Sequence, residues 1–284
     1  MAKAVELLHP MRPRERDGRL VRDHRFVLRQ MTATWRVAPH FLVAGAMKAG
    51  TSSLFYYLCQ HPRIVGPFRK ETHYFTAGHR AGKGEDWYRA HFPLRWQLGK
   101  GYLTGEATPG YMFEPDGPER IARALPDIRV IVVLRDPVAR AVSHYRHEVA
   151  MGREFLPFDQ AIALEEERRA RAAAAGPAGH ETWLHASYKA RGIYLEQIRR
   201  LEAAIPRERI FVLGSALLRH RPAEAVAAVL GFLGLPMEGE YNFAQKNRSK
   251  VSDPLPEPVL AELSDFFASH NARLFDHLGF EPEW

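Results

Sequence analysis

The chain has 284 residues, of which 46% are hydrophobic and 26% are charged, a composition typical of folded globular proteins and unlike that of disordered or fibrous chains. The longest stretch without Asp, Glu, Lys or Arg covers 14 residues, from Ala49 to Pro62, whereas a membrane helix needs about 20. The formal net charge of +7 is moderate and no nucleic-acid motif accompanies it, so no nucleic-acid partner is expected. The single cysteine excludes an internal disulfide framework and a multi-cysteine zinc site.

The N-terminal 40 residues hold nine basic and four acidic residues, so most of the positive excess lies there. This segment is either a basic arm or a solvated charged face around packed residues such as Val27, Leu28 and Trp35. We assign residues 1–39 to a basic arm and residues 40–284 to a single domain. The N-terminus lacks an apolar core of signal-peptide length, and a cytoplasmic location is therefore expected.

After residue 39 the chain alternates between short apolar runs and helical patterns. Strands are predicted at 40–46, 101–108, 129–134 and 209–214, and helices at 51–60, 137–152, 192–205 and 222–234. The run at 129–134 (RVIVVL) is apolar and β-branched, as a central parallel strand should be. The alternation predicts an α/β fold, a three-layer α/β/α sandwich with a mostly parallel central sheet.

The turn after the first strand reads Gly-Ala-Met-Lys-Ala-Gly-Thr-Ser-Ser over residues 45–53. A glycine-bearing turn at this place offers backbone N–H groups and a helix N-terminus to a phosphate. The turn is P-loop-like but departs from the Walker pattern, because Lys48 precedes Gly50 by two residues and Thr51 stands where the lysine should be. Two alternatives stand beside a phosphate-binding turn of this kind. The protein is a nucleotide kinase or NTPase, or the segment is a tight turn followed by an ordinary helix cap.

A second group of polar residues follows the short apolar run at 64–68. Glu71 and His73 are two residues apart, so in an extended segment both side chains project to one side. A base and its partner could meet a substrate hydroxyl there.

A third group follows the strand at 129–134. Arg135 leaves the strand end and Ser143 lies about two helical turns further on, and an arginine with a hydroxyl can hold a second phosphate. Asp136 comes one residue late for a metal-binding acid, and we interpret it as a helix cap beside Pro137.

The stretch EEERRARAAAAGPAG over 165–179 changes from a charged helix to an Ala, Gly and Pro segment with little to bury. We expect a mobile surface segment near 165–182. Two interpretations stand for this segment: it is a plain solvated loop, or it is a lid that covers the substrate.

Taken together, the motifs resemble those of sulfotransferases that use 3′-phosphoadenosine 5′-phosphosulfate (PAPS). The nearest likeness is the branch of heparan sulfate sulfotransferases and their bacterial relatives. The resemblance covers about residues 40–280 and rests on Lys-x-Gly-Thr-Ser-Ser, Lys-Glu-x-His-Tyr-Phe, Gly-Glu-Ala-Thr-Pro-Gly-Tyr, Arg-Asp-Pro-x-x-Arg-Ala-x-Ser-x-Tyr, Arg-Gly-Ile-Tyr, Phe-Leu-Gly-Leu-Pro and Lys-Asn-Arg-Ser-Lys.

The resemblance implies a PAPS site and release of adenosine 3′,5′-bisphosphate (PAP), with no metal required. Six residues match the loop that holds the 5′-phosphosulfate: Lys48, Ala49, Gly50, Thr51, Ser52 and Ser53. Arg135 and Ser143 match the pair on the 3′-phosphate. A basic loop that closes over the same end is matched by Lys246, Asn247, Arg248, Ser249 and Lys250.

The resemblance also implies roles in the reaction. Glu71 matches the general base, and Lys48 would stabilise the leaving phosphate. Beside Glu71, Lys70 is a candidate to bind the acceptor, and His73 either takes part in catalysis, orients Glu71 or binds the acceptor. Glu106 and Tyr111 either line the acceptor cleft or act as a capping acid and a packed ring.

The acceptor is expected to be a hydroxyl, with an amine as second choice, of a glycan, glycolipid or small metabolite. Thr76 stands where heparan-modifying enzymes often carry an acid, which argues against a heparin-like acceptor.

Overall fold

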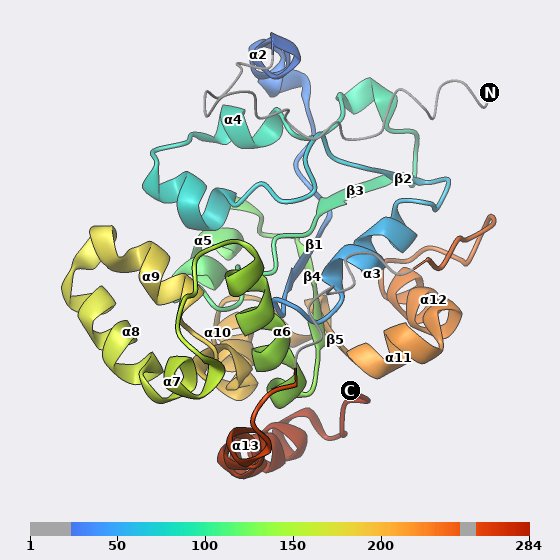
Figure 1. The fold of residues 1–284 in the computed structure, drawn as a ribbon. Coiled ribbons are helices and arrows are strands. Elements are labelled where there is room, and N and C mark those ends of the chain that lie inside the picture. Colours follow the sequence, from blue (N-terminus) through green and yellow to red (C-terminus); the bar gives the residue numbers. More distant parts are fainter. Residues whose placement is uncertain (1–23, 245–253) are drawn as a thin grey trace.

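The computed structural model of the protein describes residues 24–244 and 254–284. At the centre of this part of the chain lies a sheet with the strand order β2-β3-β1-β4-β5 (Figure 1). Its strands are β1 (Phe41–Gly45), β2 (Ile64–Val65), β3 (Leu103–Glu106), β4 (Arg129–Leu134) and β5 (Ile210–Gly214). Neighbouring strands pair in parallel throughout. The predicted α/β fold with a parallel central sheet is confirmed.

Helices cover both faces of the sheet. They are α2 (His24–Met31), α3 (Thr51–Leu58), α4 (Glu85–Arg89), α5 (Gly117–Ala124), α6 (Pro137–Ala150), α7 (Phe158–Ala163), α8 (Glu165–Ala174), α9 (His180–His185), α10 (Tyr194–Ala204), α11 (Ser215–His220), α12 (Pro222–Phe232) and α13 (Glu257–Leu278). Figure 1 shows α3 and α12 on one side of the sheet and α5 and α10 on the other. The long α13 packs against α10 and α6.

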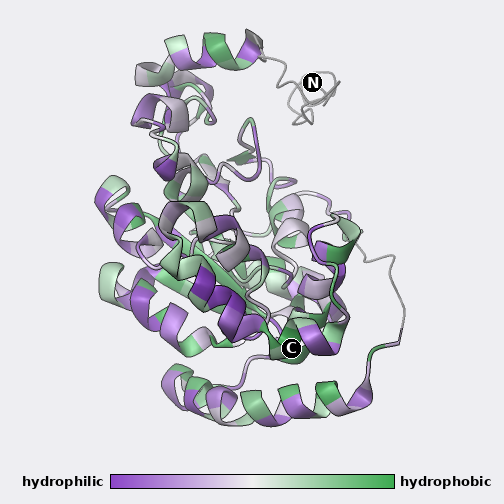
Figure 2. Cartoon of the chain, turned by 60° about the vertical axis from the view of Figure 1, so that its left-hand side comes forward, coloured by the Kyte–Doolittle hydropathy of each residue, from purple (hydrophilic) through white to green (hydrophobic). Residues whose placement is uncertain are grey.

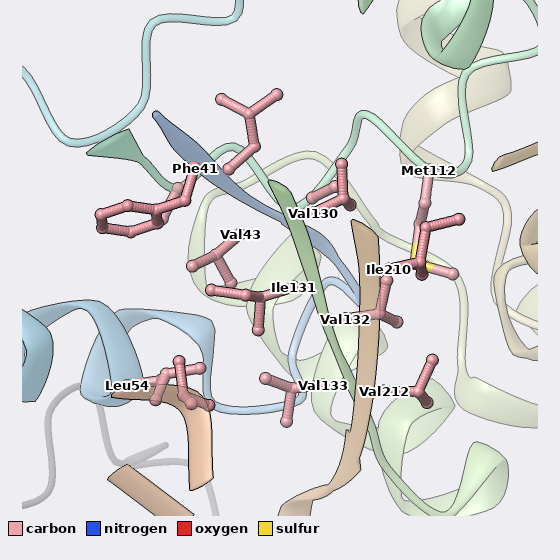
Figure 3. Packing of buried hydrophobic residues seen from close by; sticks show 14 of the residues in the cluster. Phe41, Val43, Leu54, Met112, Val130, Ile131, Val132, Val133, Ile210 and Val212 are labelled. Atoms are coloured by element: carbon pink, nitrogen blue, oxygen red, sulfur yellow. The ribbon is translucent and has the colours of Figure 1, made fainter. Parts of the chain in front are cut away.

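The core follows from the alternation of side chains along buried strands. In β4 the side chains of residues 130–134 are all buried, and successive residues point to opposite faces. Figure 3 shows Ile131 and Val133 directed toward Leu54 of α3, whereas Val130 and Val132 point toward Met112. The sheet lies inside helices that carry both apolar and polar residues (Figure 2). A strand with two buried faces needs an unbroken apolar run, and β4 has one.

The four predicted strands and four predicted helices all occur, with ends shifted by a few residues. Several elements carried no clear signal in the sequence, among them α11 and α13. The C-terminal segment is tied to the start of α11, because the backbone N–H of Ala216 donates to the carbonyl of Glu283 at 2.9 Å.

The N-terminal segment differs from the expected arm from residue 24 onward. Phe26 of α2 packs on Phe68 and His91, with ring centroids 5.5 and 4.6 Å apart. Arg29 donates to the carbonyls of Ala90 and Phe92 at 2.6 and 2.7 Å. Residues 24–39 are therefore joined to the body, and residues 1–23 lie outside the described part.

The residues expected to be packed in this segment were wrongly chosen. Val27, Leu28 and Trp35 are 43%, 63% and 57% exposed. The buried residues of the segment include Ala33 and Arg36. For Val27 and Leu28 the reason is that α2 carries apolar residues on two sides, and only the side with Phe26 meets the body. Trp35 lies beyond α2, in a 3₁₀ turn at Ala33–Trp35, and its ring lies 6.4 Å from that of Trp96.

The stretch near 165–182 is largely helical, so the structure does not show the plain loop that was one interpretation of it. It forms α8, a 3₁₀ turn at 176–179 and α9. Glu165 is buried and accepts the backbone N–H of Ala190 at 2.8 Å. Because Gly179 lies directly against the backbone of Ala172, the small residues of this stretch serve close packing between the two helices. Its mobility and its role as a lid stay predictions.

Candidate active site

A cavity of about 510 Å³ opens at the carboxyl ends of β1, β4 and β5. Strand order reverses on either side of β1, and ligands of open α/β sheets bind at such a switch point. Its walls are Met47, Lys48, Ala49, Gly50, Thr51, Ser52, Ser53, Tyr57, Glu71, Pro109, Arg135, Ala139, Val142, Ser143, Arg146, His147, Ser215, Leu218 and Arg219. The cavity thus brings together the turn after β1, the pair Arg135 and Ser143, and Glu71.

The turn after β1 has an unusual backbone. Lys48 has φ of 69° and Gly50 has φ of 101°, both in the left-handed region that favours glycine. A Cβ on Gly50 would also lie 3.2 Å from the Leu218 side chain. The left-handed Gly50 precedes the first turn of α3, whose N–H groups form an anion-binding end.

Lys48 is held in place by its neighbours. Its carbonyl accepts a hydrogen bond from the Arg135 guanidinium at 2.9 Å. Burial lowers the pKa of Lys48, and the nearby carboxylates of Glu148 and Glu71 oppose that change. A partly buried cation of this kind interacts strongly with an anion in the cavity.

Arg135 and Ser143 face the cavity from the end of β4 and from α6. The Arg135 carbonyl accepts from the Tyr194 hydroxyl at 2.8 Å. Asp136 caps α6, because its side chain accepts the N–H of Ala139 at 2.7 Å. The interpretation of Asp136 as a helix cap is confirmed.

Glu71 sits between two basic neighbours. Lys70 Nζ donates to Glu71 Oε1 at 2.5 Å and to Ser52 Oγ at 2.7 Å, so one lysine links the turn after β1 to the carboxylate. His73 Nε2 lies 3.4 Å from Glu71 Oε2. Burial alone would raise the pKa of Glu71, but the hydrogen bonds from His73 and Lys70 outweigh it and lower the pKa to about 2. Glu71 is therefore an ionised carboxylate near neutral pH.

The contact between Glu71 and His73 does not arise from an extended segment. His73 has φ of 53° and precedes a short π-type turn at 74–78. Thr76 closes this turn, since its hydroxyl donates to the His73 carbonyl at 3.1 Å. A left-handed turn, rather than strand alternation, brings the two side chains together.

Glu106 and Tyr111 do not line the cavity. Both side chains are fully buried, and Glu106 accepts hydrogen bonds from the hydroxyls of Tyr88, Thr108 and Tyr111 at 2.7–2.9 Å. It also accepts the N–H and hydroxyl of Thr72. The expectation of acceptor contacts is wrong for these two residues, because their polar atoms are already used inside the protein. Glu106 instead anchors Thr72, which lies between Glu71 and His73.

Five wall residues with polar side chains were missed by sequence reasoning: Tyr57, Arg146, His147, Ser215 and Arg219. Arg146 and His147 follow Ser143 by about one helical turn, a spacing that could have drawn attention to them. Ser215 and Arg219 follow β5, and a search of every strand end would have found them. The predicted basic loop with Lys246, Asn247, Arg248, Ser249 and Lys250 lies outside the described residues.

Within residues 24–244 and 254–284, no cluster of three or more His, Cys, Asp or Glu residues could hold a metal ion. Across the same ranges, no helix combines the length and apolar character that crossing a bilayer requires.

Comparison with known proteins gives consistent results. The family model of the sulfotransferase domain matches residues 38–252. The heparan sulfate glucosamine 3-O-sulfotransferase 5 of Homo sapiens is 24% identical over 306 residues, covering 98% of this chain and 81% of that protein. The membrane-associated sulfotransferase kil1 of Dictyostelium discoideum is 40% identical over 111 residues, covering 39% of this chain and 23% of its own length. The chain thus spans less than a quarter of the slime-mould protein.

A solved structure agrees with these matches. The sulfotransferase from Alicyclobacillus acidocaldarius superposes with a TM-score of 0.70 at 31% identity, covering 86% of this chain and 97% of that chain. With the family model matching most of the sequence, the chain belongs to the sulfotransferase family and is an enzyme that transfers a sulfuryl group.

Proposed function

We propose that the chain transfers the sulfuryl group of PAPS to a hydroxyl, releasing PAP. In this proposal Glu71 is the general base, Lys48 stabilises the leaving phosphate, and Arg135 with Ser143 binds the 3′-phosphate. The observation that carries the proposal is that all four residues line one cavity.

The charge of the cavity supports an anionic nucleotide. Its described walls contain four Lys or Arg residues and a single carboxylate, Glu71. Arg135 Nε is buried and has no hydrogen-bond partner among the described residues. Since buried polar atoms in proteins are nearly always paired, a ligand at this end of the cavity would satisfy the guanidinium.

The chain's own residues supply the remaining chemistry. The donor provides an electrophilic sulfur with a nucleotide phosphate as leaving group. Glu71 is ionised and can accept the proton of the attacking hydroxyl. Lys70 bonds both Glu71 and Ser52, and so holds the base at a fixed place relative to the donor loop. His73 is proposed to orient Glu71 from its other oxygen.

For the acceptor we propose a hydroxyl of a glycan, glycolipid or small metabolite. One relative is named as a heparan sulfate glucosamine 3-O-sulfotransferase. This chain has the neutral Thr76 where heparan-modifying enzymes often carry an acid, and its hydroxyl donates to the His73 carbonyl. The cytoplasmic location expected from the sequence stays a prediction, which cell fractionation tests.

Calorimetric titration with PAP tests the donor site. We expect micromolar binding of PAP that does not depend on Mg²⁺, with ATP and GTP binding much more weakly. Tight Mg²⁺-dependent binding of a triphosphate, without binding of PAP, would overturn the proposal in favour of a nucleotide kinase or NTPase.

A further inference from the structure

The ends of β4 and β5 lie at the same level of the sheet. Leu134 pairs with Gly214 in the parallel register. The next residues, Arg135 and Ser215, therefore leave neighbouring strands side by side and enter the same cavity. Arg135 begins the connection to α6, and Ser215 begins α11.

Ser215 is a buried hydroxyl without a partner. Its side chain is 4% exposed, and its Oγ has no hydrogen-bond partner among the described residues. The same holds for Arg135 Nε. Two unpaired polar atoms on adjacent strand ends, both at the wall of one cavity, indicate a polar group that is shared between them when a ligand binds.

Arg219 adds a second guanidinium to this end of the cavity. It follows Ser215 by four residues and so lies on the same side of α11. Burial lowers the pKa of Arg135, and the positive charge of Arg219 lowers it further, which places the two charges within electrostatic reach of each other. Glu71 is the single carboxylate among the described walls, and Asp136, which neighbours Arg135 in the chain, partly offsets the lowering of its pKa.

We propose that Arg219 and Ser215 join Arg135 and Ser143 in binding the 3′-phosphate of the donor, and that Arg219 contributes to the preference for nucleotides that carry this phosphate. The inference rests on the proposed PAPS-dependent function. A phosphate monoester carries a charge of about −1.5 to −2 near pH 7. One guanidinium leaves part of that charge unbalanced, and two in a shared site can neutralise it.

The test compares two nucleotides that differ only in the 3′-phosphate, PAP and adenosine 5′-monophosphate. In Arg219→Ala, the Kd for PAP should rise on the order of tenfold, as expected for loss of a charge-assisted contact. The Kd for the monophosphate should stay within about twofold. Arg219→Lys, which keeps the charge but not the two-pronged donor geometry, should lie between.

A matched control lies two residues further along the chain, at the end of α11. Arg221 pairs with Glu224 at 2.9 Å and also with Glu283, and it does not line the cavity. Arg221→Ala should leave both Kd values unchanged. Equal weakening of both nucleotides in Arg219→Ala, or no weakening at all, would overturn the role of Arg219.

Ser215→Ala tests the hydroxyl separately. Loss of one hydrogen bond should raise the Kd for PAP about threefold and leave the Kd for adenosine 5′-monophosphate unchanged. If wild-type protein itself binds PAP no better than the monophosphate, the proposed donor is wrong. If wild-type protein prefers PAP and the variants keep that preference, only the subsite assignment fails.

Discussion

Glu71 illustrates how a few contacts set the chemistry of one side chain. Lys70 and His73 bond its two oxygens, and together they lower its pKa to about 2 although burial acts in the other direction. The carboxylate is thus ionised near neutral pH. Because its pKa is low, it is only a weak base. Its contribution must come from its position beside the attacking hydroxyl as much as from its basicity.

Replacing Glu71 with Gln keeps the size of the side chain but removes the base. We expect kcat to fall by about 100-fold or more, with the Kd for PAP unchanged within about twofold, measured by radiolabel transfer and calorimetry. Glu85→Gln, at a carboxylate paired with Arg89 on the exposed side of α4, is the control and should be fully active. Wild-type turnover in Glu71→Gln would assign proton removal to another group.

Glu106 supports the same site from inside the protein. Its carboxylate accepts the N–H and the hydroxyl of Thr72, and Thr72 lies next to Glu71. Glu106→Gln should reduce stability by about 1–3 kcal/mol, because an amide cannot accept from every donor that surrounds it. We also expect kcat to fall while the Kd for PAP is retained. A variant with normal thermal stability and normal kcat would show that this buried network is dispensable.

At the scale of secondary structure, α6 links the cavity to the helices that follow it. Its N-terminal half carries Ser143, and its last turn carries the buried Glu148. The Glu148 carboxylate accepts from Arg153 Nε at 2.6 Å and lies 3.1 Å from His185 Nδ1 of α9. The chain from α8 to α9 is thereby joined to the wall of the cavity.

The Glu148 contacts predict a pH-dependent stability. Burial would raise the pKa of Glu148, but the hydrogen bond from Arg153 and the close contacts with His144 and His185 outweigh it, so the pKa is lowered from 4.5. A lowered carboxylate pKa contributes stability above the unfolded value and loses it as pH falls below that value. Glu148→Gln should therefore lower the free energy of unfolding by about 2 kcal/mol at pH 7. This loss is smaller than that for breaking a fully buried ion pair, because Arg153 is partly exposed.

The difference between wild type and Glu148→Gln should narrow as pH falls below about 4.5, the unfolded pKa. Urea denaturation at pH 7, 5 and 3.5 measures it. Glu167→Gln, in an exposed pair with Arg171, serves as a control with little effect at any pH. A difference that stays constant with pH would contradict the assignment of Glu148 as a paired carboxylate.

At the scale of the whole molecule, α2 joins the N-terminal segment to the part of the chain that holds the base. Phe26 lies against Phe68, His91 and Trp87, and Phe68 precedes Glu71 by three residues. Truncating Phe26 to Ala should lower the free energy of unfolding by about 2 kcal/mol, since it removes packing in a partly buried aromatic cluster.

Leu28→Ala is the matched control for this prediction, because Leu28 lies on the same helix and is 63% exposed. Its effect should stay within about 0.5 kcal/mol. Chemical denaturation of both variants measures the contrast. Equal losses would mean that α2 is not docked through Phe26.

Some features of the protein follow from the sequence alone. The apolar run of β4 and the glycines and hydroxyls of the turn after β1 are local patterns, and local sterics and hydrogen bonding suffice to produce them. Asp136 belongs to the same class, because a cap bonds its own helix three residues away. The order of these motifs was also sufficient to indicate the sulfotransferase family.

Other features were decided only by packing between distant segments. Lys70 meets Ser52, 18 residues away, and Glu106 gathers donors from residues 72–111, so its burial could not be read from its neighbours. Ser215 and Arg219 join the cavity because β5 pairs with β4 in one particular register. The sequence also left open which apolar side of α2 meets the body, because that too depends on packing between distant segments. Sequence periodicity specifies which residues share a face, and the tertiary structure determines what that face contacts.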